Sequence, residues 1–324
     1  MIESLGTLFY ELVLESLLVS AFSWVGAVLA VRLLRITNPA WRARFFFIPL
    51  IIPVLAVPMN HIVVRPLFLR FPSTHLENLL TSLASISPSL TSVFFVLAGL
   101  LLLWSAIWAF WPLAAVCFLR LDWRWQQRSP LWLRCNGMLQ SAASKMQVSP
   151  PRLVLTSGKF CGSLALGPLG VYVVVARALV PMLDDEELEG LLSHELGHIK
   201  RKDTVVGVVA GVCYRLLAFS PFAQSAYRKF RWAREEAVDD LAVRFSGRPL
   251  ALASCLVKAC RLAQGQSHQF ATSSGLLSPK SAVDSRIQRL LDKATDAAEL
   301  PSRWYPWAYA GVIASVVVFL LLAV

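Results

Sequence analysis

Four long apolar stretches constrain this chain more than any other feature of its sequence. They cover residues 8–34, 45–64, 92–119 and 304–324, and about 20 helical residues cross a hydrocarbon layer of about 30 Å. Apolar residues make up 56% of the chain and charged residues 16%, which is typical of a membrane protein and not of a soluble one. The sequence therefore predicts an α-helical membrane protein with four transmembrane helices, the first of which is too long for a signal peptide and is expected to be retained.

The distribution of basic residues predicts how these helices are oriented. Arginine is abundant in residues 32–44 and 120–134 and sparse in the loop 65–91. Because basic loops stay on the cytoplasmic side, the N-terminus is expected outside, in the plasma or inner membrane. Residues 1–119 would form a membrane region with three spans, 120–303 a cytoplasmic domain and 304–324 the last span. The net charge of +11 then reflects contact with the lipid bilayer, and no direct nucleic acid binding is expected.

Two carboxylates and six cysteines have simple interpretations. Glu11 and Glu15 lie four apart on one face of the first span, where they either reach the outer headgroups, face other helices or serve a function. The cysteines form no C-x-x-C pair, so reduced structural thiols are expected, as in a domain that faces the cytosol.

The cytoplasmic segment begins with short strands and continues into a well-specified helix. Residues 152–157, 163–167 and 171–175 are rich in strand-forming residues, and the third could be a core strand or an edge that accepts a substrate. Asp184 and Glu187 have the spacing of a capping box at a helix N-terminus. Leucines then recur at helical spacing as far as Ile199.

The sequence HELGH lies on this helix and is typical of a metal-dependent hydrolase. His194 and His198 are one turn apart, so both can reach one tetrahedral ion at about 2.0–2.1 Å. Glu195 is offset around the helix and can act as the general base toward a water molecule that zinc activates. The alternative is a solvated helical face with two ordinary histidines, which is less favoured because the chain has only five.

A catalytic zinc site needs a third protein ligand, and residues 231–245 offer the best candidates. Glu235 and Asp239 are four apart, as are Glu236 and Asp240. Either glutamate could bind the metal while its aspartate braces a ligand histidine. The alternative is an exposed acidic patch paired with neighbouring arginines. The apolar segment 203–222 lies between the two motifs, and we expect it to be a buried helix or to dip into the bilayer, because a fifth crossing would separate the two halves of the site.

The segment from ALGPLG to HELGHIKRKD, followed by AREEAVDDLAV and SRIQRLL, resembles the BlaR/MecR family of integral-membrane zinc metallopeptidases. The resemblance implies an α+β gluzincin-type metalloprotease domain inserted between spans three and four. It implies His194, His198 and Glu235 as zinc ligands and Glu195 as the general base. Asp239 matches the family's aspartate four residues after the third ligand, which contacts a ligand and not the metal. Family members often have cysteine where this chain has Val238, and alignment on the paired aspartates favours Glu235 over Glu236.

The resemblance also implies a protein substrate, commonly a BlaI-type winged-helix repressor whose cleavage switches genes on. The antibiotic sensors of the family carry a penicillin-binding domain after the fourth span, whereas this sequence ends at Val324. We therefore expect the signal to arrive through the spans, the loop 65–91 or another protein. The sequence is compatible with a homo-oligomer.

Three other functions compete with this one. An HtpX-like membrane-protein quality-control protease shares HExxH and E-x-x-A-D, although it has fewer spans before the motif and a hairpin between the motifs. A site-2 protease is disfavoured, because no N-x-x-P…L-D-G motif is present. A non-catalytic receptor or assembly factor with a structural metal site is disfavoured as well, because such sites usually have four ligands and are rich in cysteine.

The sequence does not single out a residue that would stabilise an oxyanion. The candidates are Tyr214, Tyr227, His268 and Arg286, and each of them fits an ordinary packing or surface role equally well.

Overall fold

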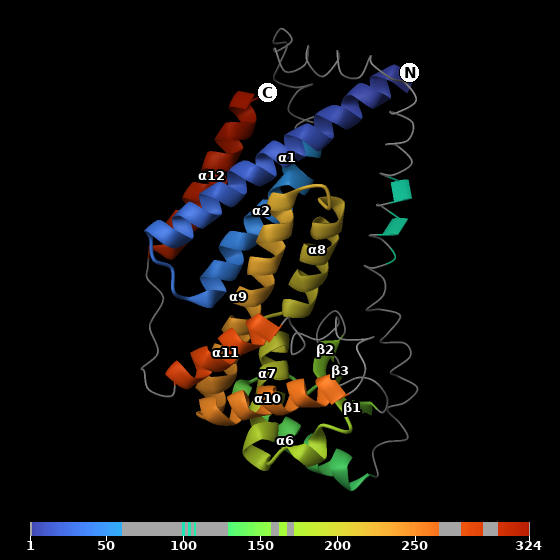
Figure 1. The fold of residues 1–324 in the computed structure, drawn as a ribbon, viewed down its shortest axis with the longest axis vertical. Helices are drawn as coiled ribbons and strands as arrows, with labels where there is room; N and C mark the ends of the chain where they lie inside the picture. The colour runs from blue at the N-terminus through green and yellow to red at the C-terminus, as the bar shows by residue number, and fades with distance from the viewer. Residues whose placement is uncertain are drawn as a thin grey trace. The chain divides into compact units, whose positions relative to one another are not determined.

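The computed structural model describes residues 2–59, 99–100, 103–104, 107, 129–156, 162–166, 172–265, 280–293 and 304–323, and is mostly helical (Figure 1). The chain divides into two compact units. The first contains residues 1–109, 209–233 and 301–324, and the second contains 110–208 and 234–300. Residues 209–233 therefore belong with the apolar helices; the sequence predicted one domain over 120–303, within which 203–222 was expected to be a buried helix or to dip into the bilayer.

The first unit is built on apolar helices. Helix α1 (Ile2–Leu33) packs against α2 (Pro39–Met59) and α12 (Tyr305–Ala323). Residues 12–33 and 39–59 are long and apolar enough to cross a membrane, and α12 contributes a shorter apolar segment, 305–319. The first, second and fourth predicted spans thus coincide with helices. The predicted third span, 92–119, lies almost wholly outside the described residues, so the prediction of four crossings remains one.

Helix α2 contains three internal prolines, Pro49, Pro53 and Pro58. Each proline lacks the N–H that would bond the carbonyl four residues earlier, and a carbonyl left without a donor is costly in hydrocarbon. The carbonyl of Pro49 would have bonded residue 53, and the hydroxyl of Ser20 on α1 is the donor in this contact, 3.5 Å from that oxygen. This distance is at the long limit of a hydrogen bond, so the serine offers the free carbonyl at most a weak donor.

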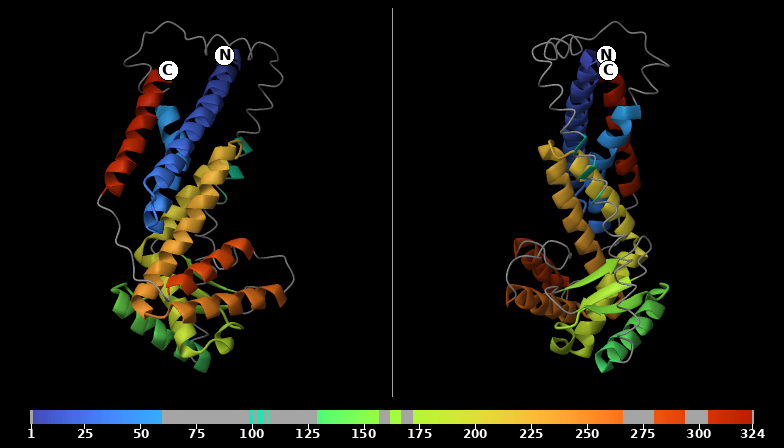
Figure 2. Two further views of the ribbon diagram at one scale, coloured as in Figure 1. Left: turned by 60° about the vertical axis from the view of Figure 1, so that its left-hand side comes forward. Right: turned by 90° about the vertical axis from the view of Figure 1, so that its right-hand side faces the viewer.

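A helical hairpin connects the two predicted motifs. It consists of α8 (Asp203–Leu216) and α9 (Pro221–Ser246), which lie side by side (Figures 1 and 2). Tyr214 and Tyr227 stack across it with ring centroids 4.3 Å apart. At its tip the Ser220 hydroxyl donates to the Ser20 hydroxyl at 3.1 Å. The tip therefore packs against the middle of α1, a candidate membrane span, which agrees with the expectation of a buried or membrane-dipping segment.

The second unit holds a small mixed sheet. Strands β1 (Arg152–Thr156), β2 (Ser163–Leu166) and β3 (Tyr172–Ala176) lie in the order β1-β3-β2, with β1 parallel and β2 antiparallel to β3. All three strands appear where the sequence predicted them. Because β3 is paired on both sides, it is a core strand and cannot accept a substrate by edge addition.

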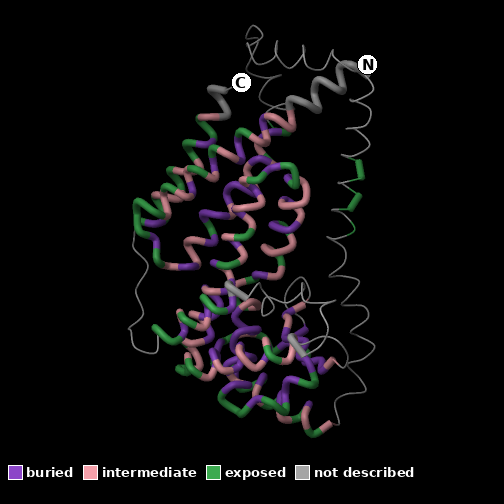
Figure 3. Tube along the Cα trace, in the orientation of Figure 1, coloured by how far each residue is buried: buried purple, intermediate pink, exposed green. Residues whose placement is uncertain are grey.

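Helices α6 (Pro130–Met146) and α7 (Asp185–Lys200) pack against this sheet, α10 (Pro249–Gly265) packs on α7, and α11 (Lys280–Lys293) packs on α10. A short 3-10 helix lies at Val180–Met182. Side chains alternate along a strand, so Val173 and Val175 join the main core with the leucines of α7, while Tyr172 and Val174 form a smaller cluster on the opposite face. The buried residues of this unit gather around α7 and the sheet (Figure 3). This packing fixes α7, the helix that carries HELGH.

Candidate metal centre

Helix α7 begins as its sequence predicts. The Asp184 carboxylate accepts from the Glu187 backbone N–H at 2.8 Å, and the Glu187 carboxylate accepts from the Asp184 N–H at 3.0 Å. This capping box satisfies two N–H groups that would otherwise lack partners. Leu188, Leu191, Leu192 and Leu196 are fully buried. The apolar stripe therefore sets the rotation of α7, and with it the direction of the two histidines.

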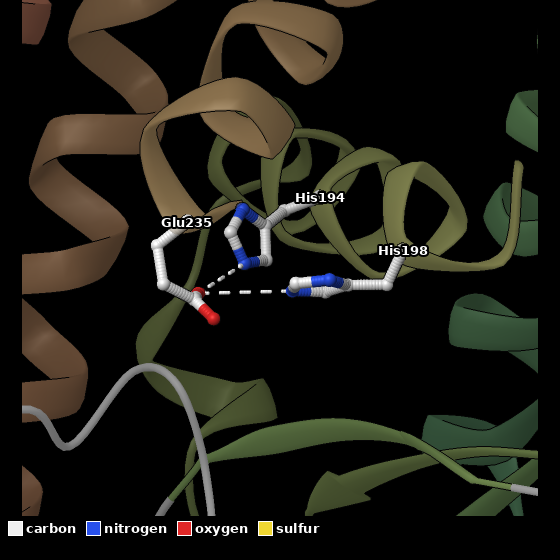
Figure 4. A group of neighbouring side chains, drawn as sticks. All are labelled: His194, His198 and Glu235. Atoms are coloured by element: carbon white, nitrogen blue, oxygen red, sulfur yellow. Dashed lines mark ion pairs between the residues drawn. The ribbon is translucent and has the colours of Figure 1, made fainter. Parts of the chain in front are cut away.

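His194 and His198 converge with Glu235 (Figure 4). Glu235 Oε2 lies 3.6 Å from His194 Nε2 and 3.7 Å from His198 Nε2. One ligand atom from each residue falls within a group whose members are all within 4.8 Å of one another. Glu235 is 3% exposed and His194 1%, so the alternative of a solvated face and an exposed acidic patch does not hold.

A glycine allows α7 and α9 to approach closely enough for this convergence. A Cβ atom on Gly197 would lie 2.9 Å from Val238 Cγ1, a distance that side chains avoid. Val238 is fully buried and stands on α9 three residues after Glu235. The glycine of HELGH thus lets the turn of α9 that carries Glu235 pack directly on the turn of α7 that carries the histidines.

Each histidine has a carboxylate on the side away from Glu235. His194 Nδ1 lies 3.0 Å from Asp239 Oδ1, and His198 Nδ1 lies 3.1 Å from Asp203 Oδ2. A carboxylate that hydrogen-bonds a ring nitrogen fixes the orientation and the tautomer of a histidine. The His198–Asp203 contact has hydrogen-bond geometry, whereas His194 Nδ1 lies near Asp239 as an ion pair and makes no hydrogen bond within the described residues. The sequence analysis proposed Asp239 for this role and missed Asp203. One feature of the sequence could have indicated Asp203: it is an acidic residue only five positions after His198. In the structure it is the first residue of α8.

Arginines hold the carboxylates in turn. Arg286 of α11 donates from Nε and Nη2 to the two oxygens of Asp239, both at 2.7 Å. Arg286 was considered as an oxyanion stabiliser, but this two-bond contact directs it to Asp239. Tyr214 and Tyr227, two further candidates, belong to the first unit and stack on each other. His268, the fourth candidate, lies outside the described residues.

Arg289 of α11 contacts the alternative pair, Glu236 and Asp240. The Asp240 carboxylate accepts from Arg289 Nη2 at 2.7 Å, and the backbone carbonyl of Glu236 accepts from Arg289 Nη1 at 3.1 Å. Glu236 is absent from the group that could hold a metal. The geometry therefore selects Glu235 and Asp239 from the two registers that spacing left open.

Opposite charges dominate the electrostatics of the two histidines. Burial would lower the pKa of His194, but its contacts with Asp239 and Glu235 raise that pKa above the ordinary value. Burial also opposes protonation of His198, yet the Glu235 charge and the hydrogen bond with Asp203 raise its pKa to about 9. Without a metal, both rings therefore favour the protonated form.

The carboxylates respond in the opposite sense. Burial would raise the pKa of Glu235, but His198, His194 and Arg286 hold it well below the usual range. The pKa of Asp239 is lowered against burial mainly by Arg286. Both carboxylates are therefore charged, and the group offers the negative charge that a divalent cation requires.

The geometry of the three residues fits a metal ion better than it fits direct hydrogen bonds. Glu235 Oε2 is buried and has no hydrogen-bond partner within the described residues, although two imidazole nitrogens lie just beyond bonding distance. Ligands at about 2.0–2.1 Å from one tetrahedral ion lie roughly 3.4 Å from each other, close to the separations of 3.6 and 3.7 Å found between these atoms. Two nitrogens and one carboxylate oxygen leave a fourth position for water or substrate.

The remaining sequence features outside this site have limited roles. Glu15 is buried at 8% exposure, which agrees with a side chain that faces other helices and not the headgroups, while the side chain of Glu11 lies outside the described residues. The four described cysteines, Cys135, Cys213, Cys255 and Cys260, are unpaired. Burial raises the pKa of the Cys135 thiol to about 11, as expected for a structural thiol.

Comparison with known proteins points to membrane proteases. The profile of the family described as BlaR1 peptidase M56 matches residues 18–290. A curated protein named protease HtpX homolog from Methanopyrus kandleri is 29% identical over 159 residues, which are 39% of this chain and 50% of that protein. A protein of the same name from Methylibium petroleiphilum is 28% identical over 163 residues, 40% and 57% of the two chains. This chain thus spans about half the length of these relatives.

Proposed function

Because the chain belongs to the BlaR1 peptidase M56 family, we propose that it is a zinc-dependent endopeptidase of the membrane. Zinc is the ion that two histidines, one glutamate and an open fourth position suit best. The observation that carries the proposal is the buried Glu235 Oε2 atom, which makes no hydrogen bond within the described residues and is nearly equidistant from two imidazole nitrogens. An open site with three ligands also favours catalysis over a structural metal site in a receptor or assembly factor.

The residues divide the chemistry among themselves. A bound zinc ion would supply Lewis acidity toward water and the scissile carbonyl. His194, His198 and Glu235 hold that ion, and Asp239 and Asp203 keep the two rings oriented. Glu195, next to the first ligand and 2% exposed, takes the proton from the attacking water and passes it to the leaving amine. Burial of this carboxylate keeps bulk water from competing for the proton.

The substrate class we propose is that of an HtpX-like quality-control protease, namely membrane proteins. Two findings support it: relatives named protease HtpX homolog match 39% and 40% of this chain, and a hairpin, α8–α9, lies between the two motifs. A hairpin there was the feature that set HtpX apart in the sequence analysis. Neither finding favours cleavage of a BlaI-type repressor. The cellular place we propose is the inner membrane, with the protease residues on the cytoplasmic side.

A single-atom change in the base tests the enzyme assignment. Glu195→Gln removes the base and keeps the shape, so we expect metal content and melting temperature to stay near wild type. Cleavage should fall by about 10²–10⁴-fold. The matched control is Glu236→Gln, a neighbouring glutamate on α9 that lies outside the ligand group and should leave cleavage unchanged. Normal cleavage by the Glu195 variant would refute the proposal.

Comparative proteomics of cells with wild-type or Glu195→Gln protein tests the substrate class. We expect membrane proteins to accumulate uncut in the variant. Accumulation of a soluble DNA-binding repressor alone would instead support the signalling function and exclude the quality-control one.

A further inference from the structure

Strand β2 places a serine against the proposed catalytic base. Ser163 Oγ donates a hydrogen bond to Glu195 Oε1 at 2.5 Å. Each residue is 2% exposed, so water does not compete for this bond. The contact joins residues 32 positions apart, and neither spacing nor motif indicated it.

The sheet explains why the serine side chain faces α7. Ser163 pairs with Val175 of β3, and paired residues on neighbouring strands point to the same face. Val175 belongs to the main core with the leucines of α7. The Ser163 hydroxyl therefore enters an apolar layer, where an unbonded hydroxyl is costly, and the partner it finds there is the Glu195 carboxylate.

From this contact we infer that Ser163 is a positioning residue for Glu195. The terminal torsion of a glutamate is broad and nearly two-fold, so packing alone leaves the carboxylate free to rotate. A bond from Ser163 to Oε1 fixes that rotation and assigns the second oxygen, Oε2, to the attacking water. This inference rests on the proposed function, because it takes Glu195 as the base.

A second serine provides a matched comparison. Ser254 of α10 donates to Glu187 Oε1, also at 2.5 Å, and Lys258 donates to Glu187 Oε2 at 2.6 Å. Both serines thus bond a glutamate of α7 at the same distance. Glu187 lies in the capping box, about two turns from the histidines, so the Ser254 contact supports the helix without touching the site.

The experiment uses full-length zinc-loaded protein in phospholipid vesicles, with fluorescent casein as the substrate. Ser163→Ala should lower kcat by about 10- to 100-fold, the range associated with misplaced catalytic groups, with KM and zinc content near wild type. Ser163→Thr keeps the hydroxyl and should recover most of the loss. Ser254→Ala should lower the melting temperature and leave kcat unchanged. Wild-type kcat in Ser163→Ala, or a loss of activity explained by lost zinc, would overturn the inference.

A binding measurement separates this inference from the proposed function. A small hydroxamate binds a zinc ion and also bonds the neighbouring base. Its affinity should fall by about tenfold in Ser163→Ala and be restored in Ser163→Thr. If wild-type protein binds the hydroxamate but cleaves no protein substrate, the endopeptidase assignment fails while the serine contact is still judged by affinity. Equal affinity in wild type and Ser163→Ala overturns the positioning role whatever the cleavage result.

Discussion

Replacing Arg286 with methionine tests whether the site is held together by a buried charge network. Arg286 is 3% exposed and makes two bonds of 2.7 Å to Asp239, which is 2% exposed. Its Nη1 atom also lies 3.7 Å from Glu235 Oε2. Methionine fills a similar volume without the charge, so the change leaves the buried Asp239 carboxylate without the two bonds from its cation, while Glu235 keeps the contact of its Oε1 atom with Arg234 Nη2 at 3.3 Å.

The expected cost follows from this geometry. Removing one partner of a buried ion pair costs about 3–5 kcal/mol. A loss of 1 kcal/mol shifts the melting temperature of a unit of this size by about 2–4 °C, so the metal-free variant should melt roughly 6–20 °C below wild type. A bound divalent cation restores positive charge beside Glu235, and the deficit should therefore be smaller in metal-loaded protein.

Thermal unfolding of the detergent-solubilised protein, with and without zinc, measures both quantities. The control is Arg289→Met on the same helix, whose ion pair with Asp240 is partly exposed and should contribute about 1 kcal/mol or less. If Arg286→Met costs no more than Arg289→Met, the charge network does not stabilise the site and Asp239 does not depend on Arg286 for its position.

Three other predictions concern the metal and the helix contact. Asp203→Asn should weaken zinc binding by about 10–100-fold, measured by chelator competition, and an unchanged affinity would remove Asp203 from the site. The pKa values of both histidines are raised without metal, that of His198 to about 9, so zinc must displace protons from them at neutral pH. The zinc affinity should therefore rise with pH by roughly tenfold per unit for each proton displaced. Calorimetry of zinc binding in two buffers should detect the released protons. If affinity does not change between about pH 6.5 and 8.5, the rings are already neutral. Gly197→Ala should destabilise the protein by about 1–3 kcal/mol, because its Cβ atom would meet Val238. The control is Gly137→Ala on α6, whose Cβ atom meets nothing within 4 Å and which should be neutral or stabilising by up to about 1 kcal/mol. Equal effects of the two substitutions in denaturant unfolding would show that α7 and α9 can separate.

Much of the site followed from local sequence rules. Helical spacing put His194 and His198 on one face, and the capping box fixed where α7 begins. The choice between Glu235 and Glu236 did not follow from spacing, because both lie on one helix with an aspartate four residues later. The resemblance favoured Glu235, and tertiary contacts agree with it: Glu235 lies near both histidines, whereas Arg289 binds Asp240 and Arg286 binds Asp239.

Contacts between distant segments were outside the reach of the sequence. Ser163 is an ordinary strand residue until β2 is packed against α7, and the partner of Asp203 depends on where α8 begins after the turn. The division of the chain into two units could not be predicted either, because an apolar stretch such as 203–222 has the same composition in a protein core and in a bilayer. The hairpin tip belongs to the first unit, where its Ser220 hydroxyl contacts Ser20 of α1.

Helix α9 runs without a break from Pro221 to Ser246, and this continuity has a mechanical consequence. Its first half belongs to the first unit and its second half supplies Glu235. The end of a side chain lies about 5–6 Å from a helix axis, so turning this rod by about 20° would swing the carboxylate by roughly 2 Å, as far as a whole zinc–ligand bond. Rotation of α9 about its own axis would therefore carry Glu235 away from His194 and His198.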